Sequence, residues 1–116
     1  MPFMNIDRNK HSSCALGNNI YVVCGYDNGK LLNSFERLDT RLIEAGVAEW
    51  HLISVSFDIL TPRCEPALCA LNSDKLIILG GYRHGYCSDV VVFDERDMSC
   101  SVLVKRAPME FWAFGN

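Results

Sequence analysis

One set of residues occurs twice along the chain, and the two copies lie about 55 residues apart. Arg8 is repeated as Arg63, and Cys14-Ala15-Leu16 is repeated as Cys69-Ala70-Leu71. The apolar run at residues 20–24 is repeated at 76–79, and both runs lead to a glycine and a tyrosine. A period near 50 residues is typical of stacked supersecondary units that bury a core only together. The 116 residues therefore predict two copies of one unit, not one domain of about 100–150 residues.

Each unit predicts four short strands. The continuous apolar runs are typical of strands buried on both faces, and Val90-Val91-Val92-Phe93 is β-branched and aromatic. We expect an all-β chain with strands at residues 11–16, 20–24, 34–39 and 50–55 in the first unit and at 67–71, 76–80, 89–93 and 99–104 in the second. A polar loop at 27–30 is expected inside the first unit. Residues 40–49 predict a long outer loop with at most a short helix.

This pattern resembles the kelch repeat family. The features that carry the resemblance are Gly80-Gly81 after an apolar run, the Ser34-x-Glu36-Arg37-x-Asp39 motif, Trp50, and Arg8-x-x-His11-Ser12 before the first strand. The resemblance implies a β-propeller, whose blades are twisted four-stranded antiparallel sheets. It divides the chain into blade 1 at residues 1–57, blade 2 at 58–106 and the start of a third repeat at 107–116.

The repeats differ from the family pattern at one glycine. Cys24-Gly25 stands where the family has two glycines, a pair that allows positive φ and close packing. We expect Gly25, Gly80 and Gly81 to be structural, and Trp50 to pack between blades. Propellers close with about 4–8 blades, so two blades form only part of a propeller. The remaining blades are expected from the same or another chain.

Composition and charge exclude several classes of partner. The net charge of −3 argues against nucleic-acid binding. No stretch of about 18 apolar residues is present, so we expect no membrane span. The N-terminus lacks the basic and apolar regions of a secretory signal. The six cysteines are therefore expected to be free thiols, and the expected location is cytoplasmic.

The sequence indicates no catalytic or metal centre. Residues 25–31 have one residue too few between the glycines for a phosphate-binding loop, and Leu31 replaces its Ser or Thr. The cysteines lack the paired spacing of zinc sites. Nothing in the sequence orients Cys87 and His84 as a nucleophile and its base. We therefore expect no enzymatic activity, no metal and no cofactor.

The segments after the second strand of each unit are the expected partner contacts. Such loops gather on one face of a propeller, and tyrosine and arginine are enriched in interface hot spots. The expected contact residues are Tyr26, Asn28, Tyr82, Arg83, His84 and Tyr86. The kelch resemblance adds Arg63, because ubiquitin-ligase adaptors of this family read peptide degrons with such loops and with residues such as Arg8 and Arg63 in the inter-blade connections.

The expected function is a non-enzymatic protein–protein interaction module that presents loop surfaces to a protein or peptide partner. The Glu36-Arg37-x-Asp39 pattern is most like the kelch domains of BTB-kelch ubiquitin-ligase adaptors, which implies substrate recognition for a ubiquitin ligase. Two alternatives stay open. One is a cytoskeleton (actin)-associated kelch protein, and the other is a fragment of an enzymatic propeller of the oxidase or epimerase type.

Overall fold

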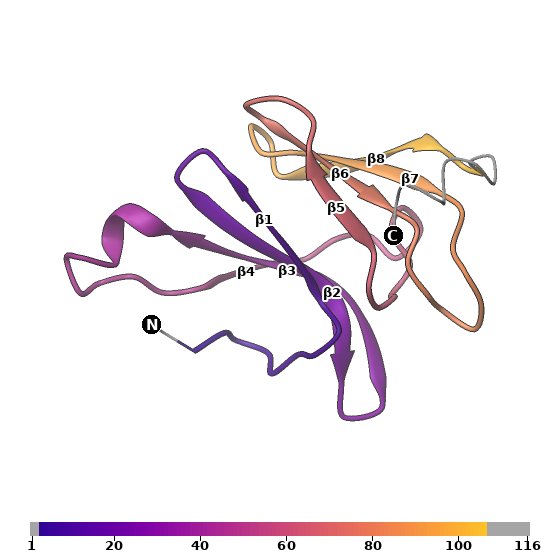
Figure 1. The fold of residues 1–116 in the computed structure, drawn as a ribbon, viewed down its shortest axis with the longest axis horizontal. Helices are drawn as coiled ribbons and strands as arrows, with labels where there is room; N and C mark the ends of the chain where they lie inside the picture. The colour runs from indigo at the N-terminus through magenta and orange to yellow at the C-terminus, as the bar shows by residue number, and fades with distance from the viewer. Residues whose placement is uncertain (1–2, 107–116) are drawn as a thin grey trace.

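The chain folds into two four-stranded antiparallel sheets that follow one another along the sequence (Figure 1). This computed structural model describes residues 3–106. In the first sheet the strand order is β1 (Ser12–Leu16), β2 (Asn19–Asp27), β3 (Lys30–Asp39) and β4 (His51–Ile53). In the second it is β5 (Ala67–Ala70), β6 (Lys75–Leu79), β7 (Val90–Asp94) and β8 (Ser99–Val104). Each sheet is a meander of sequential strands, which confirms the expected all-β fold of two four-stranded blades.

The expected third repeat at 107–116 lies outside the described residues. The boundary expected between residues 57 and 58 falls in the connection from β4 to β5, and it stays a prediction. The expected outer loop at 40–49 contains a single turn of 3-10 helix, η1 (Thr40–Leu42). The Asp39 side chain caps this turn by accepting a hydrogen bond from the Arg41 amide. Between residues 3 and 106, no helix has the length and apolar character needed to cross a membrane.

The first blade differs from expectation at the turn between β2 and β3. In place of a polar loop, the two strands continue until Asp27 pairs with Lys30. Asn28 and Gly29 alone form the turn, with φ angles of 49° and 89°. Positive φ at both positions is the two-residue turn that matches the twist of a hairpin, and Asn-Gly is its preferred sequence. Tyr26 therefore lies within the hairpin, where it pairs with Leu31 close to the turn. At the other end of the blade, β4 is shorter than expected.

Aromatic side chains join the two blades into one core. The Phe35 ring lies 4.9 Å from the Phe93 ring, and the Tyr21 ring lies 5.4 Å from it at a steep angle. The Tyr21 hydroxyl donates a hydrogen bond of 2.6 Å to Glu95 of the second blade. Leu60, in the connection between the blades, is fully buried in the same cluster. Aromatic contacts of this kind hold neighbouring blades in a fixed relative position.

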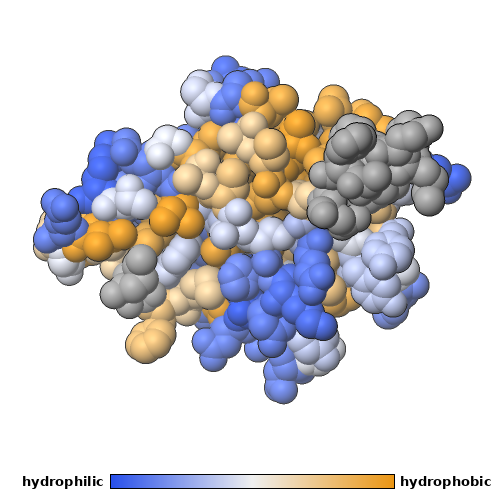
Figure 2. Space-filling view, viewed as in Figure 1, coloured by the Kyte–Doolittle hydropathy of each residue, from blue (hydrophilic) through white to orange (hydrophobic). Residues whose placement is uncertain are grey.

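The second blade leaves one apolar face open. Cys14 and Tyr21 are paired across β1 and β2 in the first blade, and Cys69 and Ile77 are the corresponding pair in the second. Tyr21 is fully buried because the second blade covers it, whereas Ile77 is half-buried and Cys69 is exposed. Figure 2 shows hydrophobic surface gathered over the second sheet.

Candidate functional site

The second strand of each blade ends in two residues with positive φ. Cys24 and Gly80 occupy the first position with φ of 62° and 63°, and Gly25 and Gly81 occupy the second with φ of 107° and 100°. A Cβ on Gly25 would lie 2.7 Å from the Asn9 carbonyl oxygen, and one on Gly81 would lie 2.9 Å from the corresponding oxygen of Cys64. The second position therefore requires glycine for space as well as for φ. The first position admits Cys24 at the cost of an unfavourable φ.

A buried arginine lies against each of these turns. The Arg8 Nη1 donates to the Cys24 carbonyl at 2.9 Å, and the Arg63 Nη1 donates to the Gly80 carbonyl at 2.9 Å. Each guanidinium is also paired with a carboxylate, Arg8 with Glu36 and Arg63 with Asp89. In the first blade the repeated arginine therefore links Cys24 in β2 to Glu36 in β3. In the second blade it links the residue after β6 to Asp89, which lies just before β7.

Arg63 was expected to contact a partner, but the structure buries its side chain. Its side chain is only 1% exposed, and its donors are directed at Asp89, Gly80 and Thr61. A buried guanidinium whose donors are satisfied within the fold has none left for a ligand. Arg63 is therefore a structural residue of the second blade, and Arg8 has the same position in the first.

The residue after each arginine fixes a tyrosine. Asn9 and Tyr26 exchange two backbone hydrogen bonds of 3.0 and 2.8 Å, and Cys64 and Tyr82 exchange two of 3.1 and 2.9 Å. The two tyrosines thus occupy equivalent places on neighbouring blades. Both residues remain accessible, with 38% of the surface of Tyr26 and 48% of that of Tyr82 exposed. The segment that carries the buried arginine of each blade therefore also fixes the backbone of an exposed tyrosine.

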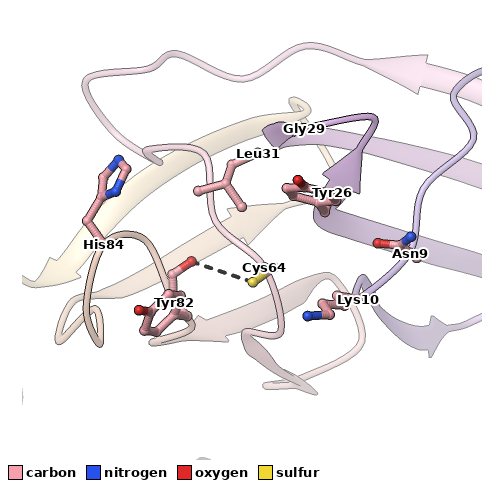
Figure 3. Close-up of a pocket in the computed structure, with 8 residues that line it drawn as sticks. All are labelled: Asn9, Lys10, Tyr26, Gly29, Leu31, Cys64, Tyr82 and His84. Atoms are coloured by element: carbon pink, nitrogen blue, oxygen red, sulfur yellow. Dashed lines mark hydrogen bonds between the residues drawn. The ribbon is translucent and has the colours of Figure 1, made fainter.

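A pocket of about 540 Å³ lies between Tyr26 of the first blade and Tyr82 of the second. Figure 3 shows Tyr26 and Leu31 from the first blade on one side, Cys64 and Tyr82 on the other, and Lys10 and His84 toward opposite ends. Its walls combine aromatic and aliphatic carbon with amine, imidazole, amide and phenol groups. The residues that line it are Asn9, Lys10, Tyr26, Gly29, Leu31, Cys64, Tyr82 and His84.

Three of the expected contact residues, Tyr26, Tyr82 and His84, line this pocket together. Tyr86 does not line it but packs edge-on against Tyr82, with ring centroids 5.7 Å apart, and is 84% exposed. Asn28 is exposed in the β2–β3 turn. Arg83 is directed elsewhere.

The Arg83 guanidinium donates to the Pro62 carbonyl at 3.2 Å and lies 5.2 Å from the centre of the Phe57 ring. Trp50 is half-buried immediately before β4, and its expected packing between blades stays a prediction. Sequence reasoning missed the other five lining residues. Among these, Asn9 and Cys64 had a usable signal, because both follow the repeated arginine.

The buried thiols of the described chain are poorly suited to nucleophilic chemistry. Burial raises the pKa of the Cys24 and Cys100 thiols to about 12. Burial also raises the pKa of Cys87, the thiol that follows His84 by three residues in the sequence. Reactive cysteines have a depressed pKa, because the thiolate is the nucleophile. All six cysteines are free, as expected.

Two consecutive antiparallel meanders packed face to face through aromatic side chains define a section of a β-propeller. Comparison with family models identifies which propeller. The model of the KLHDC2/KLHL20/DRC7 Kelch-repeats domain matches residues 4–108, and the chain belongs to this Kelch-repeat family. Kelch domains serve generally as protein-interaction modules. No curated protein matches the chain.

Proposed function

We propose that this chain is a non-enzymatic interaction module whose pocket between Tyr26 and Tyr82 binds a protein or peptide partner. The observation that carries the proposal is the origin of the pocket in both blades. The backbone of each tyrosine is held by two hydrogen bonds, so the main chain that carries each ring is already ordered before a partner arrives. Tyrosine has only two main side-chain torsions to fix, so it loses little entropy on binding, and it is enriched among interface hot spots. The pocket would accept one side chain or a short segment of the partner.

The surface around the pocket extends the proposed contact area. Tyr86 stands beside Tyr82 and is highly exposed, and Asn28 projects from the hairpin turn of the first blade. Arg83, stacked near Phe57, would contribute at the margin. We infer that Tyr86, Asn28 and Arg83 form the rim of the binding surface around the pocket.

We further propose that additional blades, from the same or another chain, cover the open face of blade 2. Ile77 corresponds to the fully buried Tyr21 of blade 1 but is only half-buried, and Cys69 beside it is exposed. A neighbouring blade would bury this face as blade 2 buries Tyr21. Substrate recognition for a ubiquitin ligase, in the cytoplasm, is the finer form of the proposal. Its support is the resemblance of the Glu36-Arg37-x-Asp39 pattern to adaptor kelch domains.

Selection of peptides from a displayed library tests the proposal. The consensus peptide would be synthesised and its affinity measured for the wild-type chain and for the Tyr26→Ala and Tyr82→Ala variants. Truncation of a hot-spot aromatic costs about 2 kcal/mol or more, so each variant should bind at least about 25-fold more weakly. Leu42→Ala, in the exposed η1, is the matched control and should bind like the wild type. Equal affinity of all four proteins would rule out the pocket as the binding surface.

A further inference from the structure

We infer that the pocket selects an acidic segment of its partner, with an apolar side chain between separated carboxylates. This inference rests on the proposed function and adds the chemical class of the ligand. The pocket offers two basic groups, Lys10 and His84, and none of its eight lining residues is acidic. It also offers Tyr26, Leu31 and Tyr82 as a largely apolar middle. Basic ends and an apolar middle are complementary to that sequence pattern.

Lys10 is available to a ligand, whereas the paired arginines of the described chain are not. Arg8, Arg41, Arg63 and Arg96 each lie within 4 Å of a carboxylate that neutralises them. Within residues 3–106, Lys10 forms no ion pair. An unpaired ammonium beside a concave surface attracts anions, and it gives up fewer existing contacts on binding than a paired guanidinium would.

The backbone holds Lys10 in place although its side chain is exposed. Its φ of 53° lies in the left-handed region, and its carbonyl accepts a hydrogen bond of 2.7 Å from the Glu65 amide. Asn9, the residue before it, is fixed to Tyr26. The start of the lysine side chain is therefore ordered, and only its methylene groups need to be immobilised by a ligand. This ordering lowers the entropy cost of binding a carboxylate.

The separation of the two basic groups favours an extended ligand over a single small anion. Figure 3 shows Lys10 and His84 toward opposite ends of the pocket, with Cys64 and Tyr82 between them. A ligand that contacts both basic groups has to extend along the pocket. A peptide that carries acidic residues on either side of an apolar one can do so, and its apolar side chain would lie against the tyrosines.

Nearby acidic residues limit the strength of this attraction. Glu65 follows Cys64 and is exposed, and Asp27 follows Tyr26 and is half-buried. Neither lines the pocket, but both lower the positive potential around it. We therefore expect a moderate electrostatic preference that decreases as the salt concentration rises.

A pair of uncharged-end pentapeptides tests the inference. One is acetylated and amidated Glu-Phe-Glu-Leu-Glu, and the other has glutamine in place of each glutamate. Chemical-shift titration of the ¹⁵N-labelled chain should map both to the pocket. At low salt the acidic peptide should bind about 10-fold more tightly, and the difference should shrink at about 0.3 M salt.

Charge reversal separates the pocket lysine from general electrostatics. Lys10→Glu should remove most of the preference for the acidic peptide. The control is Lys30→Glu, because Lys30 is an exposed lysine of the same β2–β3 hairpin as Tyr26 and Leu31 but does not line the pocket. It should reduce the preference by less than about 2-fold.

Equal binding of the two peptides at low salt, or equal effects of the two reversals, would overturn the inference. Pocket shifts with equal affinities would leave the proposed function in place and reject only the preference for acid. Binding of neither peptide at the pocket would also reject the inference, while the selected consensus peptide would still test the proposed function.

Discussion

Substitution of Arg63 by alanine distinguishes a structural arginine from a partner contact. In the structure the guanidinium donates to both carboxylate oxygens of Asp89, at 2.5 and 2.9 Å, and to the Gly80 carbonyl at 2.9 Å. Breaking a buried ion pair costs about 3–5 kcal/mol, because the remaining partner is left uncompensated. Water can partly rehydrate Asp89, whose side chain is 21% exposed. We therefore expect Arg63→Ala to lower the free energy of unfolding by about 3 kcal/mol, near the lower end of that range.

Two further arginines turn this value into a rank order. Arg8 and its partner Glu36 both have fully buried side chains, so Arg8→Ala should cost at least as much as Arg63→Ala. Arg83→Ala removes a carbonyl hydrogen bond and an aromatic contact near the surface, and it should cost less than about 1 kcal/mol. Urea unfolding at one protein concentration, followed by circular dichroism, measures all three. If Arg63→Ala and Arg83→Ala cost the same, and only Arg63→Ala weakens partner binding, our interpretation of Arg63 is wrong.

Three further predictions concern the turns, the surface ion pairs and the open blade face. Gly81→Ala should destabilise the chain by at least about 2 kcal/mol more than Gly17→Ala, because of these two glycines only Gly81 has a backbone oxygen within 3 Å of the added Cβ. Urea unfolding measures both variants, and equal losses of stability would contradict this. The hydrogen bond from Arg96 lowers the pKa of Asp94 from 3.8 to about 2, so the contribution of this pair to stability is present above about pH 4 and lost as the pH falls toward 2. Asp94→Asn should therefore flatten the fall of Tm between about pH 4 and pH 2, and an unchanged pH profile of Tm would refute this prediction. Light scattering should show the isolated chain associating beyond its 13.1 kDa monomer mass, whereas a compact, cooperatively unfolding monomer would refute the need for a covering partner.

The strands were predictable because their signals are local. Apolar runs such as the one ending at Cys24 and the β-branched run at Val90 predict buried strands without knowledge of their neighbours. The repeat then predicted how four strands are grouped into a blade. The length of the β2–β3 hairpin was missed, although Asn28-Gly29 is the preferred two-residue turn sequence. That signal was present and was interpreted as a loop.

The site was only partly predictable, because it is formed between units. Tyr26 and Tyr82 were found from their equal places in the repeat. Lys10 could not be found in the same way, since the equivalent residue of the second unit is Glu65, which does not line the pocket. The burial of Arg63 was also hidden, because its partner Asp89 has no acidic counterpart at Ser34, and the first blade uses Glu36 in its place. Pairings between segments far apart in sequence require the three-dimensional fold.

We propose that one partner segment contacts both blades at the pocket. Paramagnetic relaxation by a spin label on the selected consensus peptide tests this directly. If one segment contacts both blades, the amide signals of Tyr26 in the first blade and Tyr82 in the second should broaden strongly, with little change at Asp97 in the turn between β7 and β8. Broadening of only one tyrosine, or of Asp97 in preference to both, would contradict it.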